Sequence, residues 1–203
     1  MFYLSFLSSF SLSSLACGIV DYFYPQHRVK PVENRIIIGD YLKMLPLVSF
    51  NLLIAYPVFK ITEINIKKRK RYSQCPIEYF LCWLLTSDII FFTIHFSFHK
   101  IKYLYNKIHS IHHQYKYTYG LGAIYAHPLD FLLANLVPTF SYIWLYPPSD
   151  IMAYFIIIFS TLYTVLISHS GFNFVDNKHL KHHLLFKKNY GLLISDSIFG
   201  THI

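Results

Sequence analysis

Two long stretches with almost no charge restrict the folds that are open to this chain. Residues 151–168 run for eighteen positions without a charged side chain, which is close to the length at which a helix spans the hydrocarbon core of a bilayer. Residues 129–146 are nearly as apolar and hold only Asp130, and Pro147 and Pro148 turn the chain between the two stretches. We therefore expect a helical hairpin in a membrane.

The composition supports a membrane location for most of the chain. Hydrophobic residues make up 54% and charged residues only 14%, and the mean hydropathy is +0.37. Residues 77–98 form a third candidate span and residues 44–59 a shorter fourth. Residues 1–20 form a weak first span, because the lack of an early Lys or Arg argues against a cleavable signal peptide. The sequence predicts an all-α integral membrane protein with four to five membrane helices.

Histidines form a second pattern, because ten of the twelve gather in three short motifs or stand between them. The motifs are HFSFH at 95–99, HSIHH at 109–113 and HLKHH at 179–183. On a helix, residues four apart lie about 40° from each other and an i, i+3, i+4 triplet spans about 100°, so each motif places its imidazoles on one face. We expect a metal site with the ligands His95, His99, His109, His112, His113, His127, His169, His179, His182 and His183.

The number of histidines favours two metal ions. One tetrahedral zinc is satisfied by about four ligands, whereas about eight to ten imidazoles can surround two transition metals. The predicted hairpin returns the chain to the side that it left, so all ten histidines can meet in a helical cap at the membrane boundary, a position that suits a lipid substrate. The chain thus divides into membrane segments with a basic loop at 1–76 and a histidine-rich domain at 77–203.

The distribution of basic residues predicts the orientation. Twelve of the eighteen Lys and Arg residues fall on the histidine side of the predicted spans, and the positive-inside rule then places the cap in the cytosol. The basic run at 67–71 lies on the opposite side, and we interpret it as a solvated loop or a lipid-headgroup contact rather than a nucleic-acid site. Cys17, Cys75 and Cys82 lack CxxC spacing and indicate neither a zinc ribbon nor a disulfide framework.

The order and spacing of the motifs resemble the fatty acid hydroxylase and sterol desaturase superfamily of membrane non-haem diiron oxidases. The resemblance runs from about Asp88 to the C-terminus and rests on HFSFH, HSIHH, AIYAHPLD, ISHSGFN, HLKHH, KKNYG and DSIFGT. AIYAHPLD, HSGFN and NYG are most similar to the sterol branch, especially sterol 4-methyl oxidases. Phe96 departs from the family pattern, which usually has Arg after the first histidine, and Asn173 stands where this branch often has Asp.

The resemblance implies two iron ions, O2 as co-substrate, and hydroxylation or desaturation of a sterol at the endoplasmic reticulum. Carboxylates beside such a centre orient the rings and offset its charge. Asp88 shares the helical face of His95 and His99, and Asp130 and Asp196 belong to the HPLD and DSIFGT motifs. The chain has no nicotinamide or haem-attachment motif, so the resemblance implies electrons from NAD(P)H through a cytochrome b-type donor and its reductase.

Other functions remain open at this point. A fatty-acyl hydroxylase of the same superfamily would carry the same histidines. A membrane metal transporter or zinc-binding protein would also gather histidines near a bilayer, but transporters place their ligands at mid-depth in the spans and show internal repeats. A catalytically inactive relative is a third alternative, which the full set of histidines opposes and which Phe96 and Asn173 keep open.

Overall fold

The structure, a computed structural model, describes residues 1–69, 75–175 and 178–202. Its long helices are α1 (Phe2–Phe23), α2 (Asn34–Lys68), α3 (Pro76–Lys100) and α7 (Asp150–Leu162). The shorter elements are η1 (Pro25–His27), α4 (Lys102–Lys107), η2 (His109–Gln114), η3 (Gly120–Ile124), α5 (Pro128–Asp130), η4 (Phe131–Leu136), α6 (Val137–Leu145), η5 (Tyr163–Ser168), α8 (Lys178–Leu185) and α9 (Ser195–Ile198). Among the described residues, β pairing is limited to an isolated bridge between Arg28 and Phe172.

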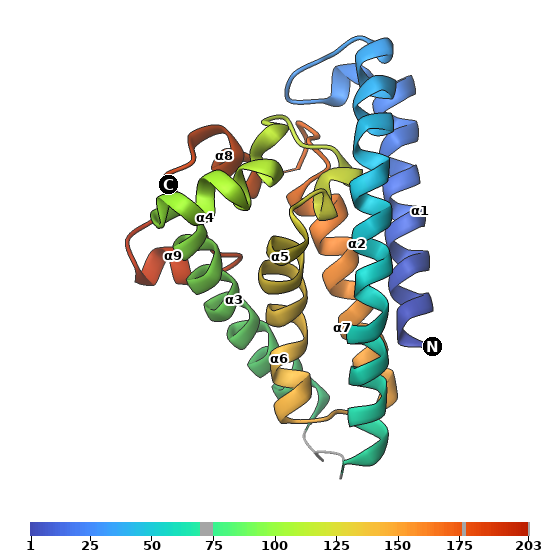
Figure 1. The fold of residues 1–203 in the computed structure, drawn as a ribbon, viewed down its shortest axis with the longest axis vertical. Helices are drawn as coiled ribbons and strands as arrows, with labels where there is room; N and C mark the ends of the chain where they lie inside the picture. Colours follow the sequence, from blue (N-terminus) through green and yellow to red (C-terminus); the bar gives the residue numbers. More distant parts are fainter. Residues whose placement is uncertain (70–74, 176–177, 203) are drawn as a thin grey trace.

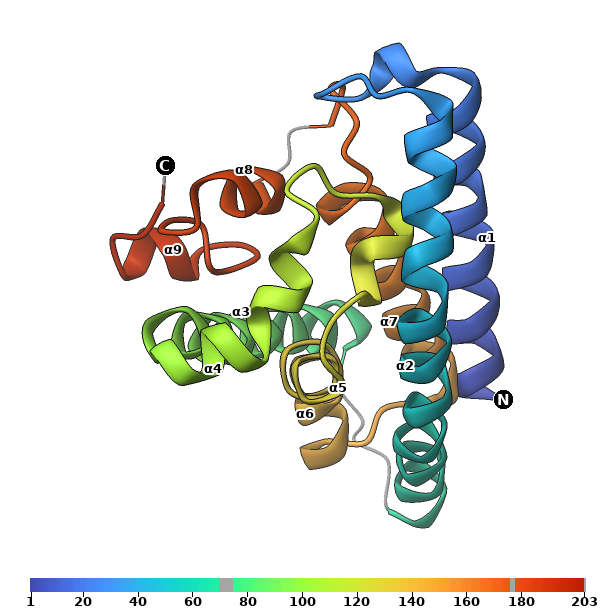
Figure 2. The same cartoon turned by 45° about the horizontal axis from the view of Figure 1, so that its top comes forward.

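The long helices form an open bundle with a cap at one end. α1 and α2 lie side by side, with α7 next to them, while α3 slants away from α2 toward the cap (Figure 1). α5 and α6 stand between α2 and α3, and the cap of α4, α8 and α9 gathers where α3 ends (Figure 2). The termini of the chain therefore lie far apart, with α1 on one side of the bundle and the C-terminal residues in the cap.

Aromatic rings and a buried amide hold the bundle together. Phe59 of α2 stacks on Phe6 of α1 at 4.8 Å between ring centroids and meets Phe140 of α6 edge-on at 4.9 Å. Such pairs contribute about 0.5–1.5 kcal/mol beyond the area they bury. The fully buried Asn51 of α2 donates to the carbonyls of Ile124 and Ala126, so the polar residue in the apolar stretch at 44–59 anchors the loop that precedes α5.

The hairpin contains a π-helical turn in each arm. In the first arm, η4 (Phe131–Leu136) follows Asp130 directly, and in the second, η5 (Tyr163–Ser168) ends next to His169. π turns have i→i+5 hydrogen bonds and occur frequently at functional sites. Here the two π turns directly adjoin Asp130 and His169.

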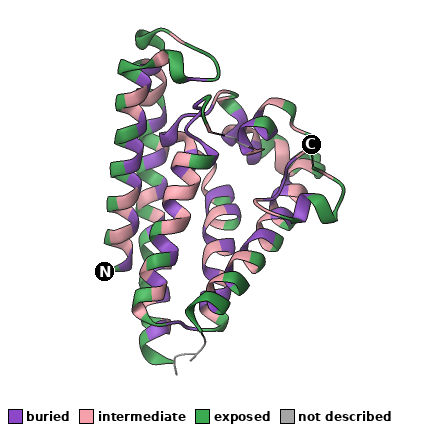
Figure 3. Cartoon of the chain, turned by 180° about the vertical axis from the view of Figure 1, so that it is seen from behind, coloured by how far each residue is buried: buried purple, intermediate pink, exposed green. Residues whose placement is uncertain are grey.

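The outer surface of the bundle is apolar, as a bilayer requires. Figure 3 shows exposed positions recurring along the outer sides of the long helices, and many are large hydrophobic residues, including Leu12 of α1, Leu53 of α2 and Ile151 of α7. Four described helical stretches are long and apolar enough to cross a membrane: Phe2–Phe23, Asn34–Lys68, Pro76–Lys100 and Asp150–Ser168. This confirms the predicted all-α protein with four to five membrane helices.

The structure refines the predicted boundaries. Residues 1–20 and 77–98 correspond to α1 and α3, while the segment at 44–59 is the middle of the 35-residue α2, which contains Pro46 and Pro57. The segment at 129–146 is helical but consists of α5, η4 and α6 and does not form one long α-helix. Lys67 and Lys68 of the basic run end α2, whereas Lys70 and Arg71 lie outside the described residues.

The fold predicts that the start of α3 and the cap lie on opposite sides of the membrane. In sealed vesicles of one orientation, the exposed Cys75 and a cysteine introduced by Asn106→Cys in α4 should react with a membrane-impermeant thiol reagent from opposite sides. A Cys75→Ser background isolates the second signal, since Cys17 is buried and Cys82 lies within α3. Labelling of both positions from the same side would contradict this arrangement.

Candidate metal centre

Nine histidines converge at the junction of the bundle and the cap, in two adjoining groups. The five-histidine group consists of His95, His99, His109, His113 and His182, and the four-histidine group of His112, His169, His179 and His183. Within each group, one ring nitrogen from every histidine lies within 4.8 Å of all the others. Residues from α3, η2, α8 and the end of the hairpin thus meet at one place, although they are up to 88 positions apart in the sequence.

The two HxxHH motifs are each shared between the groups. His109 and His113 of η2 join the five-histidine group, while His112 between them turns to the four-histidine group. In α8 the division is reversed, because His179 and His183 join the four-histidine group and His182 the other. Each motif therefore bridges two centres instead of forming half of one. The HSIHH motif is also a 3₁₀ helix, not the α-helix on which its spacing was interpreted.

Hydrogen bonds fix which nitrogen of the rings carries the proton. The Nδ1 atoms of His95, His112, His169 and His182 contact the carbonyl oxygens of Tyr190, Tyr125, Thr164 and Lys188, at 2.7 to 3.2 Å. A carbonyl oxygen can only accept, so these Nδ1 atoms donate, and in a neutral ring Nε2 then carries a lone pair. His109 Nδ1 has Asp130 Oδ2 as its acceptor at 2.7 Å. Five rings are thus prepared as Nε2 ligands.

The spacing of the Nε2 atoms fits ligands around a cation. Metal–nitrogen bonds of about 2.1 Å place neighbouring ligand atoms about 3.0 Å apart in an octahedron and about 3.4 Å apart in a tetrahedron. The Nε2 separations are 2.9 to 3.2 Å in the five-histidine group and 3.1 to 3.5 Å in the four-histidine group. His112 and His169 face each other at 3.3 Å with both protons held on Nδ1, so lone pair opposes lone pair. A cation between them removes this repulsion.

Burial favours the neutral form of His112, His113, His169 and His182. Removal from water lowers the pKa of His112 to about 4 and the pKa of His169 to about 3. The same cause lowers the pKa of His182 to about 3. Burial also lowers the pKa of His113 far below its usual value, and the neighbouring His109 and His182 lower it further. Neutral imidazole is the form that binds metal. In addition, His95 Nε2 is buried and has no hydrogen-bond partner among the described residues.

The three aspartates predicted to support the histidines differ in what they contact. Asp130 bonds a ring directly, through His109. Asp196 accepts from the backbone N–H groups of Tyr190 and Gly191 and so fixes the loop whose Tyr190 carbonyl holds His95. Asp88 accepts from the N–H groups of residues 192–195 and from the Ser195 hydroxyl. It therefore anchors the C-terminal loop to α3 and does not contact a ring.

His127 belongs to neither group. Its Nδ1 accepts from the backbone N–H of Leu129 at 3.2 Å, so the ring caps the N-terminus of α5, with Pro128 in the first turn. The two departures from the family pattern also lie outside the groups. Phe96 packs against Tyr190, and Asn173 donates to the Gln26 carbonyl.

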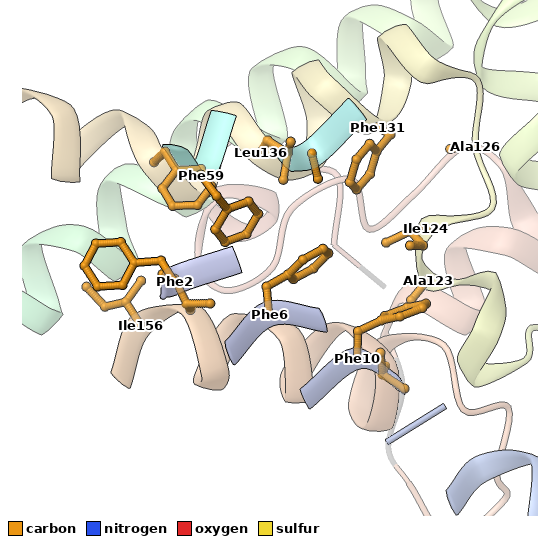
Figure 4. Close-up of a cluster of buried hydrophobic side chains, with 14 of the residues drawn as sticks. Phe2, Phe6, Phe10, Phe59, Ala123, Ile124, Ala126, Phe131, Leu136 and Ile156 are labelled. Carbon is orange, nitrogen blue, oxygen red and sulfur yellow. The ribbon is translucent and has the colours of Figure 1, made fainter. Parts of the chain in front are cut away.

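A cavity of about 180 Å³ extends from the histidines into the bundle. Its histidine end is lined by His95, His109, His112, His169 and His179, and its other walls are mostly apolar. Phe6, Phe10, Phe59 and Phe131, which line it, point inward from α1, α2 and the hairpin in Figure 4. On α3 the lining reaches from His95 to Trp83, twelve positions that span about 18 Å of helix. The site therefore combines histidines that could hold metal ions with an elongated apolar compartment.

Comparison with known proteins agrees with this arrangement. The model of the family described as fatty acid hydroxylase matches residues 80–201, which contain all nine converging histidines. The chain belongs to this family. The matched part begins within α3, so α1, α2 and the loops that join them lie outside the family match. No solved structure matches the chain.

Its relatives carry both fatty acid and sterol names. The fatty acid hydroxylase ahd1 of Mycosarcoma maydis is 27% identical over 87% of this chain and 49% of its own length. Methylsterol monooxygenase 2-2 of Arabidopsis thaliana is 29% identical over 83% of this chain and 67% of its own. The C-4 methylsterol oxidase erg25 of Schizosaccharomyces pombe is 30% identical over 54% of this chain and 43% of its own. The chain spans about half the length of the first of these relatives.

The charge-assisted bond between Asp130 and His109 predicts an effect on metal affinity. Asp130→Asn should weaken metal binding by roughly 10- to 100-fold, as expected for loss of a partner that orients a ligand. Metal titration of the purified protein measures this change, and Glu33→Gln, at an exposed carboxylate at the start of α2, is the matched control. Equal affinity in the two variants would show that Asp130 does not support the site.

Proposed function

We propose that this protein is a membrane-bound lipid hydroxylase or oxidase with two irons held by the nine converging histidines, and that its substrate is a sterol or a sterol-like lipid. The observation that carries the proposal is that the five-histidine and four-histidine groups lie at the end of an elongated apolar cavity within the bundle. A soluble substrate would not need such walls, whereas a lipid can enter from the bilayer with its reactive carbon next to the histidines.

Two bound irons would supply reduction of O2 and oxidation of an unactivated C–H bond. The residues of the chain prepare the place for that chemistry. The Nδ1 bonds of the rings hold their Nε2 atoms toward the metals, and Asp130 offsets part of the positive charge. The aromatic walls of the cavity hold the lipid in one orientation and exclude water from the histidine end. In this proposal His127 is a helix cap and not a ligand.

The sterol assignment rests on the motifs and on the relatives. AIYAHPLD, HSGFN and NYG resemble the sterol branch, and two of the relatives named above are a methylsterol monooxygenase and a C-4 methylsterol oxidase. The excess of basic residues on the histidine side favours a cytosolic cap, and we propose the endoplasmic reticulum as its membrane. Electrons would come from NAD(P)H through a cytochrome b-type donor and its reductase.

Metal analysis tests the centre itself. Protein purified from iron-replete cells should carry about two irons per chain, because two groups of imidazoles are present. His112→Ala and His182→Ala should abolish turnover while the protein still inserts into membranes. His27→Ala, at an exposed histidine outside both groups, is the control and should keep activity and metal. One zinc per chain, independent of iron supply, would sink the diiron proposal.

Product analysis tests the substrate. Membranes that contain the active protein should accumulate an oxidised sterol in the presence of O2, and membranes with the His112→Ala variant should not. Lipid and sterol mass spectrometry measures both. Accumulation of hydroxylated acyl chains with unchanged sterols would replace the sterol by a fatty-acyl substrate and leave the diiron centre standing.

A further inference from the structure

Arg28, which precedes α2 and lies outside the family match, is one of the most buried side chains of the protein. It is 2% exposed and pairs with Asp21 of α1, which is fully buried. A buried ion pair is expensive to desolvate and by itself adds little stability. Asp21 also accepts from the Tyr41 hydroxyl of α2, at 2.8 Å. The pair is therefore fixed to both N-terminal helices, and its guanidinium is held in one direction.

That direction is toward the segment that follows the HSIHH motif. Arg28 Nη2 donates to the carbonyl oxygens of Thr118 at 2.8 Å and Tyr117 at 3.3 Å. The guanidinium also lies 4.2 Å from the ring centre of Tyr119. This segment begins directly after η2, which contains His112 of the four-histidine group and His109 and His113 of the other group. One side chain thus connects α1 to the segment that leaves a histidine motif.

The backbone around Arg28 holds a second histidine segment. Arg28 and Phe172 form the isolated bridge, Val29 N–H donates to the Gly171 carbonyl at 3.0 Å, and Asn173 N–H donates to the His27 carbonyl at 2.8 Å. Gly171 follows His169 by two residues and has a φ of +72°. A Cβ on Gly171 would lie 2.3 Å from the Thr118 carbonyl oxygen and 3.1 Å from Arg28 Nη2. The two histidine segments therefore touch at the guanidinium, where no space is left for a side chain on Gly171.

These contacts bear on one metal group more than on the other. His112 and His169, whose Nε2 atoms lie 3.3 Å apart, both belong to the four-histidine group. The five-histidine group also has His109 and His113 on η2, but it has no member beside Gly171, and it is held in addition by α3 and by the bonds of His109 to Asp130 and of His182 to the Lys188 carbonyl. Only the four-histidine group has a member in both segments that meet at Arg28. We propose that Arg28 is a positioning residue for the four-histidine group, so that the N-terminal segment completes this half of the metal centre. This inference rests on the proposed two-metal site.

Arg28→Lys is the direct test. A lysine keeps the charge beside Asp21, but a single ammonium cannot also bond the Thr118 carbonyl in the geometry of a planar fork. Purified Arg28→Lys protein should carry about one iron per chain where the parent carries about two. Tyr119→Phe is the matched control, because it removes the bond to Asp40 and keeps the ring next to the guanidinium. It should keep both irons.

Spectroscopy identifies the metal that is lost. The Mössbauer spectrum of the iron that remains in Arg28→Lys should match that of His179→Ala, which lacks a ligand of the four-histidine group. It should differ from the spectrum of His182→Ala, in which the other group is broken. A purely structural role of Arg28 would lower both occupancies together. If Arg28→Lys fails to insert, Gly171→Ala disturbs the same junction from the opposite side and should give the same loss.

The outcomes separate the two proposals. A parent protein without two metals would overturn the diiron proposal and this inference with it. A parent with two irons and an Arg28→Lys variant that also holds two would overturn only the role of Arg28. Loss of both irons from an inserted Arg28→Lys protein would likewise overturn it, since the effect would not be specific to the four-histidine group.

Discussion

The structure depends on bringing nine imidazoles together with ring nitrogens facing one another, and in five of the rings the hydrogen bonds at Nδ1 leave a lone pair on the inward Nε2. Such an arrangement is repulsive without a cation, and the protein opposes the repulsion by fixing the outer side of the rings. Four carbonyl oxygens from three separate segments, two of them in the loop between α8 and α9, and the carboxylate of Asp130 accept the Nδ1 protons of five of them. The C-terminal loop is held in turn by Asp88 and Asp196. Many contacts of the cap therefore orient the histidine rings, and the long helices hold the cap in place.

The sequence predicted the parts of this arrangement that depend on local pattern. Uncharged stretches indicated the spans, and the spacing of HFSFH and HLKHH indicated histidines on helices, which α3 and α8 bear out. The sequence could not predict how the HxxHH motifs are shared. Their i and i+4 residues face one group and their i+3 residue the other, and that depends on how η2 and α8 are placed against each other. Tertiary placement, not periodicity, decides it.

The same limit applies to the supporting residues. Asp88 was expected beside the rings because it shares their helical face, yet it lies about two turns below His95 and bonds a loop that is distant in sequence. His127 was expected among the ligands because it stands between histidine motifs, but Pro128 starts a helix there and the ring caps it. The carbonyls that hold the rings have no side-chain signature, so no motif could reveal them. The burial of Arg28 could not be predicted from the sequence either, because a single Arg in a loop is usually exposed to solvent.

The candidate site includes residues that lie outside the family match. The match covers every converging histidine, but the cavity that opens onto them is closed by Phe6 and Phe10 of α1 and Phe59 of α2. These helices also hold Asp21 and Tyr41, which fix the guanidinium between the segments of His112 and His169. In the proposed centre the histidine motifs provide the ligands, while residues before the match line the cavity and position the four-histidine group. A metal centre at a membrane boundary needs both the histidine motifs and the helices before the match, because several of its ligands lie on loops that the neighbouring helices restrain.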